Sequence, residues 1–223
     1  MAPCAAGQEK KRDYARVTMN RIQAKQILSF KRSIASIFID ECPLGEYLSK
    51  NGDSSYEDLW CAWLLPGDGQ DGQDGQYIWT LLNEKRNCNL PVLLCPDDMD
   101  FWCTIIVAQV RFYEDTVVWE RIGLVKEAID VKQWRESGIQ NIEKWSKSDR
   151  EMYGDILQGA GADDKIWEKW WSEHWADEET RRLWNYFHVY FNNDENIQWL
   201  DCERLVFRTN DYDTCVSAFP GSY

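Results

Sequence analysis

The stretch Phe101–Val125, FWCTIIVAQVRFYEDTVVWERIGLV, decides the fold class of this chain. Its two halves, FWCTIIVAQVRF and TVVWERIGLV, are rich in β-branched and aromatic residues, which favour extended strands. Between them lie Tyr113, Glu114 and Asp115, a short polar break of the length that joins neighbouring antiparallel strands. The pattern therefore predicts a β-hairpin over these residues.

Further strands are predicted on the N-terminal side of this hairpin. Leu90–Leu94 is a short apolar run that ends before Pro96 and an acidic turn. Tyr56–Leu65 and Tyr77–Leu82 are apolar runs on either side of the Gly-rich segment PGDGQDGQDGQ, which predicts a second hairpin. Ser33–Ile39 fits either a strand or the end of a buried helix.

Helical patterns lie on both sides of the predicted strands. Thr18 is suited to cap a helix that begins at Met19, because apolar residues up to Phe30 recur at helical spacing. After Lys126, apolar residues recur three or four positions apart in segments rich in Glu, Lys and Gln, as they do in amphipathic helices.

These patterns together predict one α+β domain over residues 19–223, preceded by a disordered basic lead-in at residues 1–18. A mostly antiparallel sheet of four to six strands is expected in the N-terminal half, at residues 33–125. Helices of the C-terminal half, at residues 126–200, are expected to pack on it. Residues 205–208 are expected to add a closing strand at the sheet edge.

The charge of the chain is unevenly distributed. The formal net charge is −13, yet residues 1–32 hold eight basic and two acidic side chains, a net of +6. The remaining residues therefore carry a net charge of −19. A body of this charge repels phosphate backbones, which disfavours nucleic acid as a partner, and attracts a basic protein.

The eight cysteines are expected to be reduced thiols. The N-terminus lacks the apolar core of a secretion signal and no run of 18 apolar residues occurs, which predicts a cytoplasmic protein with no membrane partner. No CxxC pair is present, which disfavours a zinc knuckle. Cys61 and Cys103 lie in the apolar runs LWCAWLL and FWCTIIV and are expected to be buried. The sequence thus predicts no cofactor and no metal site.

Two acidic clusters resemble binding motifs. The DGQ repeat places Asp68, Asp71 and Asp74 three residues apart, but it lacks the spacing and the late Glu of a calcium loop and predicts a solvated hairpin loop. A second cluster follows Pro96 and consists of three carboxylates: Asp97, Asp98 and Asp100. Such a cluster suits either a Mg²⁺ or Mn²⁺ site or a turn that faces a partner, and the partner-facing interpretation is favoured because few further ligands exist.

Tryptophan is unusually frequent, with 13 residues. Trp167, Trp170, Trp171, His174 and Trp175 recur at helical spacing, and Leu183–Phe191 forms a second such stripe that includes His188. Core packing explains most of these positions, and both histidines are expected at the core or its boundary. Acidic residues among the aromatic ones also suit a docking face, for which the candidate contacts are Trp171, Trp175, Glu178 and Glu179.

No catalytic motif is present: GxSxG, HExxH, the Walker A sequence and GxGxxG are all absent, so no catalytic residue is predicted. The composition favours a non-enzymatic binding protein that captures a basic protein, of the bacterial immunity or antitoxin type that neutralises a toxin. The alternative is a carboxylate-dependent enzyme that acts on a glycan or another neutral or cationic substrate. A scaffold role is neither favoured nor excluded.

Overall fold

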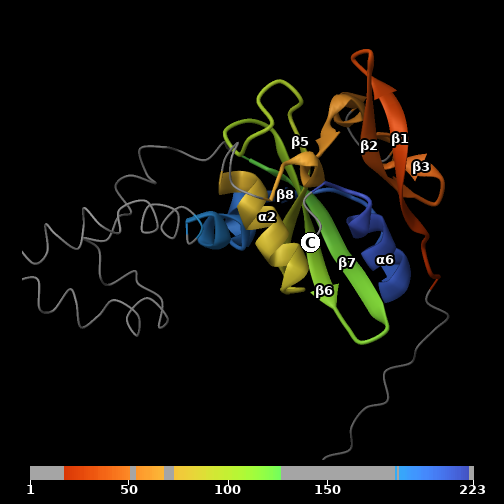
Figure 1. The fold of residues 1–223 in the computed structure, drawn as a ribbon. Coiled ribbons are helices and arrows are strands. Elements are labelled where there is room, and N and C mark those ends of the chain that lie inside the picture. Colours follow the sequence, from red (N-terminus) through yellow and green to blue (C-terminus); the bar gives the residue numbers. More distant parts are fainter. Residues whose placement is uncertain (1–17, 51–53, 68–72, 127–183, 185, 221–223) are drawn as a thin grey trace, which may run out of the picture.

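The computed structural model describes residues 18–50, 54–67, 73–126, 184 and 186–220. Within these ranges the chain forms two sheets, in which every strand pair is antiparallel, together with several helices (Figure 1). The α+β class is therefore confirmed. In this part of the chain, no helix is both long and apolar enough to cross a membrane.

The smaller sheet has three strands in the order β1-β2-β3 and is followed by a short helix. The elements are β1 (Ile22–Ser29), β2 (Arg32–Ile39), β3 (Cys42–Pro43) and α1 (Leu44–Ser49). Ser33–Ile39 therefore lies in a strand, but the helix predicted from Met19 to Phe30 is wrong. Phe30 and Lys31 form a tight turn with φ of 47° and 64°. Asn-Gly is the usual sequence at such a turn, so Phe-Lys gave no indication of a hairpin.

The larger sheet has six strands, in the order β4-β5-β6-β7-β8 with β9 paired to β7. The strands are β4 (Trp60–Cys61), β5 (Cys88–Leu94), β6 (Ile105–Phe112), β7 (Thr116–Val125), β8 (Ile197–Trp199) and β9 (Leu205–Arg208). The hairpin predicted over Phe101–Val125 is confirmed as β6 and β7. The predicted strand at Leu90–Leu94 and the predicted closing strand are confirmed as well, the latter beside residues 116–119 of β7.

The second predicted hairpin is wrong, because its second arm is a helix. Residues 56–65 contain only the two-residue strand β4, flanked by the 3-10 helices η1 (Ser54–Asp58) and η2 (Ala62–Leu64). Residues 77–82 belong to α2 (Gln73–Asn83). Tyr77, Ile78, Leu81 and Leu82 are all buried, and this spacing places them on one face of a helix. A six-residue apolar run alone does not distinguish a strand from a helix.

A C-terminal helix that the sequence did not predict, α6 (Thr209–Ser217), joins the two sheets by packing on β1, β7 and β9 (Figure 1). Its Tyr212 ring lies 5.8 Å from Trp63, and the Trp63 indole also meets Trp119 at 6.5 Å in an edge contact. The Trp63 indole nitrogen donates a hydrogen bond to the carbonyl oxygen of Pro91 at 3.2 Å. These large buried rings form the centre of the core.

The separation of strands and helices along the chain is confirmed only in part. Helices α1 and α2 come before the main strands, and β8 and β9 follow residue 196. Near the C-terminus, α6 and a helical segment at residues 186–191 do pack on the sheet core. The helices predicted between residues 127 and 183 lie outside the described residues, as does nearly all of the predicted lead-in.

Candidate functional site

The connection between β5 and β6, residues 95–104, brings acidic, aromatic and thiol side chains together; it is called the β5–β6 turn below. Its ends are joined because the Cys95 N–H donates a hydrogen bond to the Thr104 carbonyl oxygen at 3.0 Å. Inside it, the Met99 N–H donates to the Cys95 carbonyl oxygen at 3.1 Å, and Met99 has a φ of 51°. The chain thus folds back on itself within a few residues.

Asp74, in the first turn of α2, fastens the β5–β6 turn to the core. Its carboxylate accepts a hydrogen bond from the Phe101 N–H at 2.9 Å. The pKa of Asp74 is raised to about 6: burial raises it, the hydrogen bond from the Phe101 N–H opposes the rise, and the charge of Asp100 adds a smaller increase. A Cβ on the neighbouring Gly75 would lie 2.2 Å from the Pro66 carbonyl oxygen, so this position requires glycine.

The last copy of the DGQ repeat is therefore part of a packed helix, and the solvated hairpin loop predicted for the repeat is wrong at Asp74. Buried contacts to two distant segments explain the difference, and a local pattern does not reveal such contacts. Asp68 and Asp71 lie outside the described residues.

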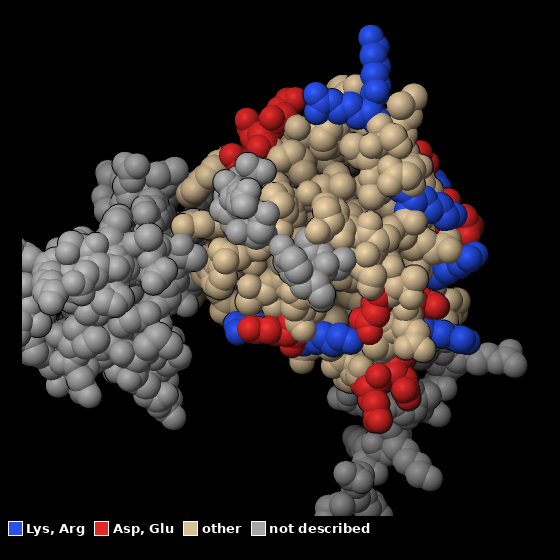
Figure 2. All heavy atoms as spheres, in the orientation of Figure 1, with Lys and Arg blue, Asp and Glu red and all other residues tan. Residues whose placement is uncertain are grey.

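The three predicted partner-binding carboxylates lie together on the β5–β6 turn. Asp97 and Asp98 are exposed, and neither forms an ion pair with another residue that the structure describes. Asp100 is half-buried, and its Oδ1 accepts a hydrogen bond from the Trp102 N–H at 2.9 Å. Figure 2 shows acidic side chains gathered at the upper left, over this turn as it lies in Figure 1.

Trp102 is a further candidate contact that the sequence analysis missed. It is half-buried, so part of it packs on the core while part remains open to solvent. Its position directly after the acidic cluster was the available signal. Four further partner contacts were predicted in the helical stripe that begins at Trp167: Trp171, Trp175, Glu178 and Glu179. They lie outside the described residues, as does His174.

Two thiols meet on the β5–β6 turn as well. The Sγ atoms of Cys95 and Cys103 and a carboxylate oxygen of Asp98 all lie within 4.8 Å of one another. A hydrogen bond with Cys95 and partial burial raise the pKa of Cys103. Cys103 is only half-buried, so the expectation of a buried side chain is wrong. The residue lies two positions before β6 begins and is therefore outside the sheet.

Three of the other described thiols differ from this pair in burial. Cys61, Cys88 and Cys215 are buried, and burial raises the pKa of both Cys88 and Cys215 to about 12. Such thiols remain protonated at neutral pH and are poor nucleophiles. Among the cysteines that the structure describes, all seven are free.

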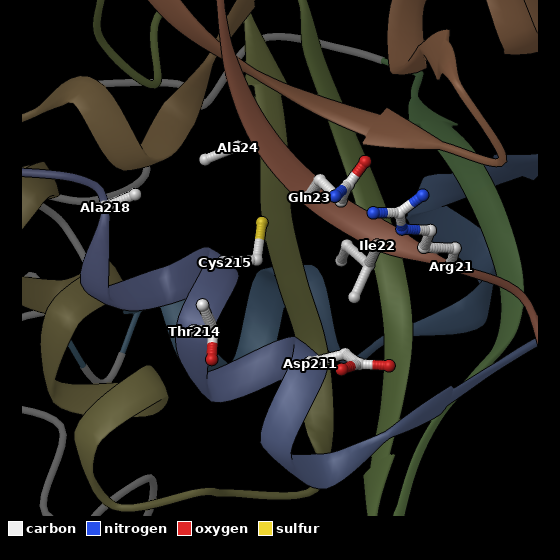
Figure 3. Close-up of a pocket in the computed structure, with 8 residues that line it drawn as sticks. All are labelled: Arg21, Ile22, Gln23, Ala24, Asp211, Thr214, Cys215 and Ala218. Atoms are coloured by element: carbon white, nitrogen blue, oxygen red, sulfur yellow. The ribbon is translucent and has the colours of Figure 1, made fainter.

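A pocket of about 250 Å³ lies between β1 and α6 (Figure 3). Its polar lining includes Arg21, Gln23, Asp211 and Thr214. The Arg21 guanidinium is already paired with Glu41, at 2.9 Å between Nη1 and Oε1. The one thiol that lines the pocket is Cys215, which is protonated at neutral pH. The pocket therefore offers no activated nucleophile.

Comparison with protein-family models, with curated proteins and with solved structures finds no match for this chain. The chemistry of the β5–β6 turn must accordingly be inferred from its own residues. Three features define this candidate site: exposed carboxylates, a half-buried indole and a pair of neighbouring thiols.

Proposed function

We propose that this chain is a non-enzymatic binding protein that captures a basic protein through the β5–β6 turn. The observation that supports this most directly is the combination, on one fixed turn, of the half-buried indole of Trp102 with exposed Asp97 and Asp98, which form no ion pair with any residue that the structure describes. Exposed carboxylates speed the encounter with a basic surface, whereas an aromatic side chain retains the partner once it has bound.

Rigidity of the turn adds to this argument. Asp74 and the backbone hydrogen bonds at Cys95 and Met99 hold the turn before any partner arrives. A turn whose backbone is already ordered loses less conformational entropy on binding than a flexible one, and this raises affinity. Several other carboxylates are neutralised within the chain, for example Asp213 by Lys85 and Asp194 by Arg121.

Among basic partners, a toxin is the type that fits best, so the proposed role is that of an immunity protein or antitoxin acting in the cytoplasm. Such a protein requires a stable fold and a negative surface, and it requires no catalytic groups. The net charge of −13 gives the chain the electrostatic sign for this role.

The test is affinity capture from an extract of the native host with three forms of the tagged chain. The forms are the wild type, Asp97→Lys with Asp98→Lys, and the matched control Glu114→Lys with Asp115→Lys on the turn between β6 and β7. A genuine partner is a basic protein that the wild type and the control retain and the first variant loses. Its recovery should also fall at roughly 0.5 M salt, because the Debye length shortens as ionic strength rises and the attraction between exposed charges weakens.

Equal capture by all three forms would contradict the β5–β6 turn as the docking surface. Recovery of only acidic or neutral proteins would contradict the proposed class of partner. For any protein recovered, purified components mixed in a stopped-flow instrument give the association rate, which should fall by about tenfold or more in the first variant.

A second candidate function has one observation in its favour. Asp74 has a pKa of about 6 and lies near Asp100, and paired carboxylates with separated pKa values are the basis of glycoside hydrolysis. Asp74 is half-buried and its carboxylate is already bonded to the Phe101 N–H, which limits its access to a substrate. Turnover of a glycan panel that disappears with Asp74→Asn would support this enzyme, and absence of turnover would count against it.

A further inference from the structure

The thiols and the carboxylate of the β5–β6 turn have the arrangement of a metal-ligand set. The Sγ atoms of Cys95 and Cys103 and a carboxylate oxygen of Asp98 lie within 4.8 Å of one another. Ligands of a tetrahedral zinc ion, at about 2.3 Å for sulfur and about 2.0–2.2 Å for oxygen, are about 3.5–3.8 Å apart. Small side-chain rotations within the turn therefore suffice to bring all three onto one ion.

The backbone already provides the geometry that such an ion needs. Leu94 is paired with Ile105, and the Cys95 N–H bonds the Thr104 carbonyl oxygen, so the two cysteines approach each other diagonally across the end of the β5–β6 ladder. The Met99 N–H returns to the Cys95 carbonyl oxygen and brings Asp98 over the pair. Phe101, between the ligands, is held by the Asp74 carboxylate.

The ligand groups are also available. Cys95 and Cys103 are half-buried and Asp98 is exposed, so an ion from solvent reaches all three. Neither the Cys95 thiol nor the Asp98 carboxylate is engaged by a Lys or Arg of the described residues. The Cys103 thiol contacts the Cys95 thiol and makes a weak 4.0 Å contact with the Thr104 hydroxyl.

We propose that Cys95, Asp98 and Cys103 bind one thiophilic divalent cation of the zinc class. Two sulfur ligands select against Mg²⁺ and Ca²⁺, which require oxygen ligands, and they favour Zn²⁺ among the common ions. Three protein ligands leave the fourth tetrahedral position to water. The metal site does not rest on the proposed function, but it shares Asp98 with the proposed docking surface, and bound Zn²⁺ would offset part of the negative charge that attracts a basic protein.

The spacing C-x₇-C concealed this site from motif analysis, which searches for CxxC pairs. Antiparallel pairing of β5 and β6 supplies the proximity that a short spacing supplies in a zinc knuckle. Asp98 completes the set of three ligands. The register of the β5–β6 hairpin, and not a local sequence motif, brings these ligands together.

The experiment is binding of Zn²⁺ to the full, reduced chain by isothermal titration calorimetry, with Co²⁺ absorption as a second readout. One equivalent of Zn²⁺ is expected, and Co²⁺ should give the thiolate-to-cobalt charge-transfer band of two sulfur ligands. Cys95→Ser and Cys103→Ser should each weaken binding by roughly 100-fold, and Asp98→Asn by roughly tenfold or more. Asp97→Asn, on the exposed neighbour, and Cys202→Ser, on a half-buried thiol elsewhere, are the matched controls and should bind as the wild type does.

Absence of Zn²⁺ binding by the reduced wild type would overturn the proposal. Unchanged binding in the Cys95→Ser/Cys103→Ser double variant would overturn it too, because the ion would then lie elsewhere. A Cys95–Cys103 disulfide found by mass in the oxidised chain, with no metal bound by the reduced chain, would replace the metal site with a redox pair. If the cysteine variants fail to fold, Asp98→Asn against Asp97→Asn and the wild-type Co²⁺ spectrum decide the question, since both acidic residues are exposed.

Discussion

Strand β6 connects two acidic turns, one at each end, and the two are built differently. The β5–β6 turn carries Asp97, Asp98 and Asp100, and the turn between β6 and β7 carries Glu114 and Asp115. Figure 2 shows acidic side chains over both places, at the upper left and near the bottom of the molecule. Acidity alone therefore does not single out a site.

The difference lies in what holds each turn. The β6–β7 turn is closed by the Tyr113 N–H, which donates to the Thr116 carbonyl oxygen at 2.9 Å, and Tyr113 is 55% exposed. In the β5–β6 turn, Phe101 is fully buried and the Asp74 carboxylate fastens its backbone. The first turn exposes its side chains and is bonded to α6 through its backbone, because the carbonyl oxygens of Glu114 and Asp115 accept hydrogen bonds from Thr209. The second contributes a buried ring to the core and displays thiols and carboxylates beside it.

The largest expected effect is on stability, when the buried ring of the β5–β6 turn is removed. Phe101 packs against Phe187 and Phe191, with ring centroids at 4.8 Å and 5.1 Å. Phe101→Ala should therefore lower the free energy of unfolding by about 3–5 kcal/mol, while Tyr113→Ala should change it by about 0.5 kcal/mol or less. Urea unfolding followed by tryptophan fluorescence measures both, and similar losses in the two variants would remove the contrast between the turns.

The aromatic pattern of Phe101–Val125 made the β6–β7 hairpin predictable, because local strand preference and the three-residue break agree there. The tight turn at Phe30 and Lys31 was not predictable, since neither residue favours positive φ. Helix α2 was ambiguous because six apolar residues fit both a strand and a helix. Such short runs are decided by packing against segments that are distant in the sequence.

The candidate site was predictable to a similar degree. Clustering of Asp97, Asp98 and Asp100 was visible in the sequence, and so was the presence of Trp102 beside them. The meeting of Cys95 with Cys103 depends on the β5–β6 register, and the role of Asp74 depends on a hydrogen bond between residues 27 positions apart. Neither relation has a local signature.

The next largest effect concerns pH. The Asp74 pKa is about 6 in the folded chain, above its ordinary value of 3.8, so the folded state binds more protons between these values. Stability therefore falls as pH rises from about 4 to about 6, by up to about 3 kcal/mol. Asp74→Asn retains an acceptor for the Phe101 N–H and should remove this fall, which makes the variant more stable than the wild type at pH 7.

Chemical denaturation at pH 4, 5, 6 and 7 measures this dependence, and Asp115→Asn on the other turn is the control. The difference between Asp74→Asn and the wild type should grow with pH, while the control should follow the wild type throughout. A difference that is constant across these pH values would mean that Asp74 does not titrate in this range.

A smaller effect is expected on the lifetime of the complex with the basic partner, and this prediction rests on the proposed function. Trp102→Ala should raise the dissociation rate by about 30-fold, equivalent to about 2 kcal/mol, with little change in the association rate, because a neutral ring contributes contact area and no long-range attraction. Tyr113→Ala should change neither rate. Surface plasmon resonance gives both rates, and a slower association in Trp102→Ala would mean that the ring shapes the turn itself.

The smallest effect is expected when only the exposed charges are neutralised. Asp97→Asn with Asp98→Asn, and Glu114→Gln with Asp115→Asn, should each change the free energy of unfolding by about 0.5 kcal/mol or less, because none of these side chains is buried. Thermal unfolding in matched buffers compares the two pairs. If the first pair stabilised the chain clearly more than the second, the carboxylates of the β5–β6 turn would be held together against their mutual repulsion. A bound cation or a basic partner would relieve this repulsion, so a stabilisation confined to the β5–β6 turn would strengthen the case for binding there. Equal small effects would leave that case to the Zn²⁺ titration and the capture experiment.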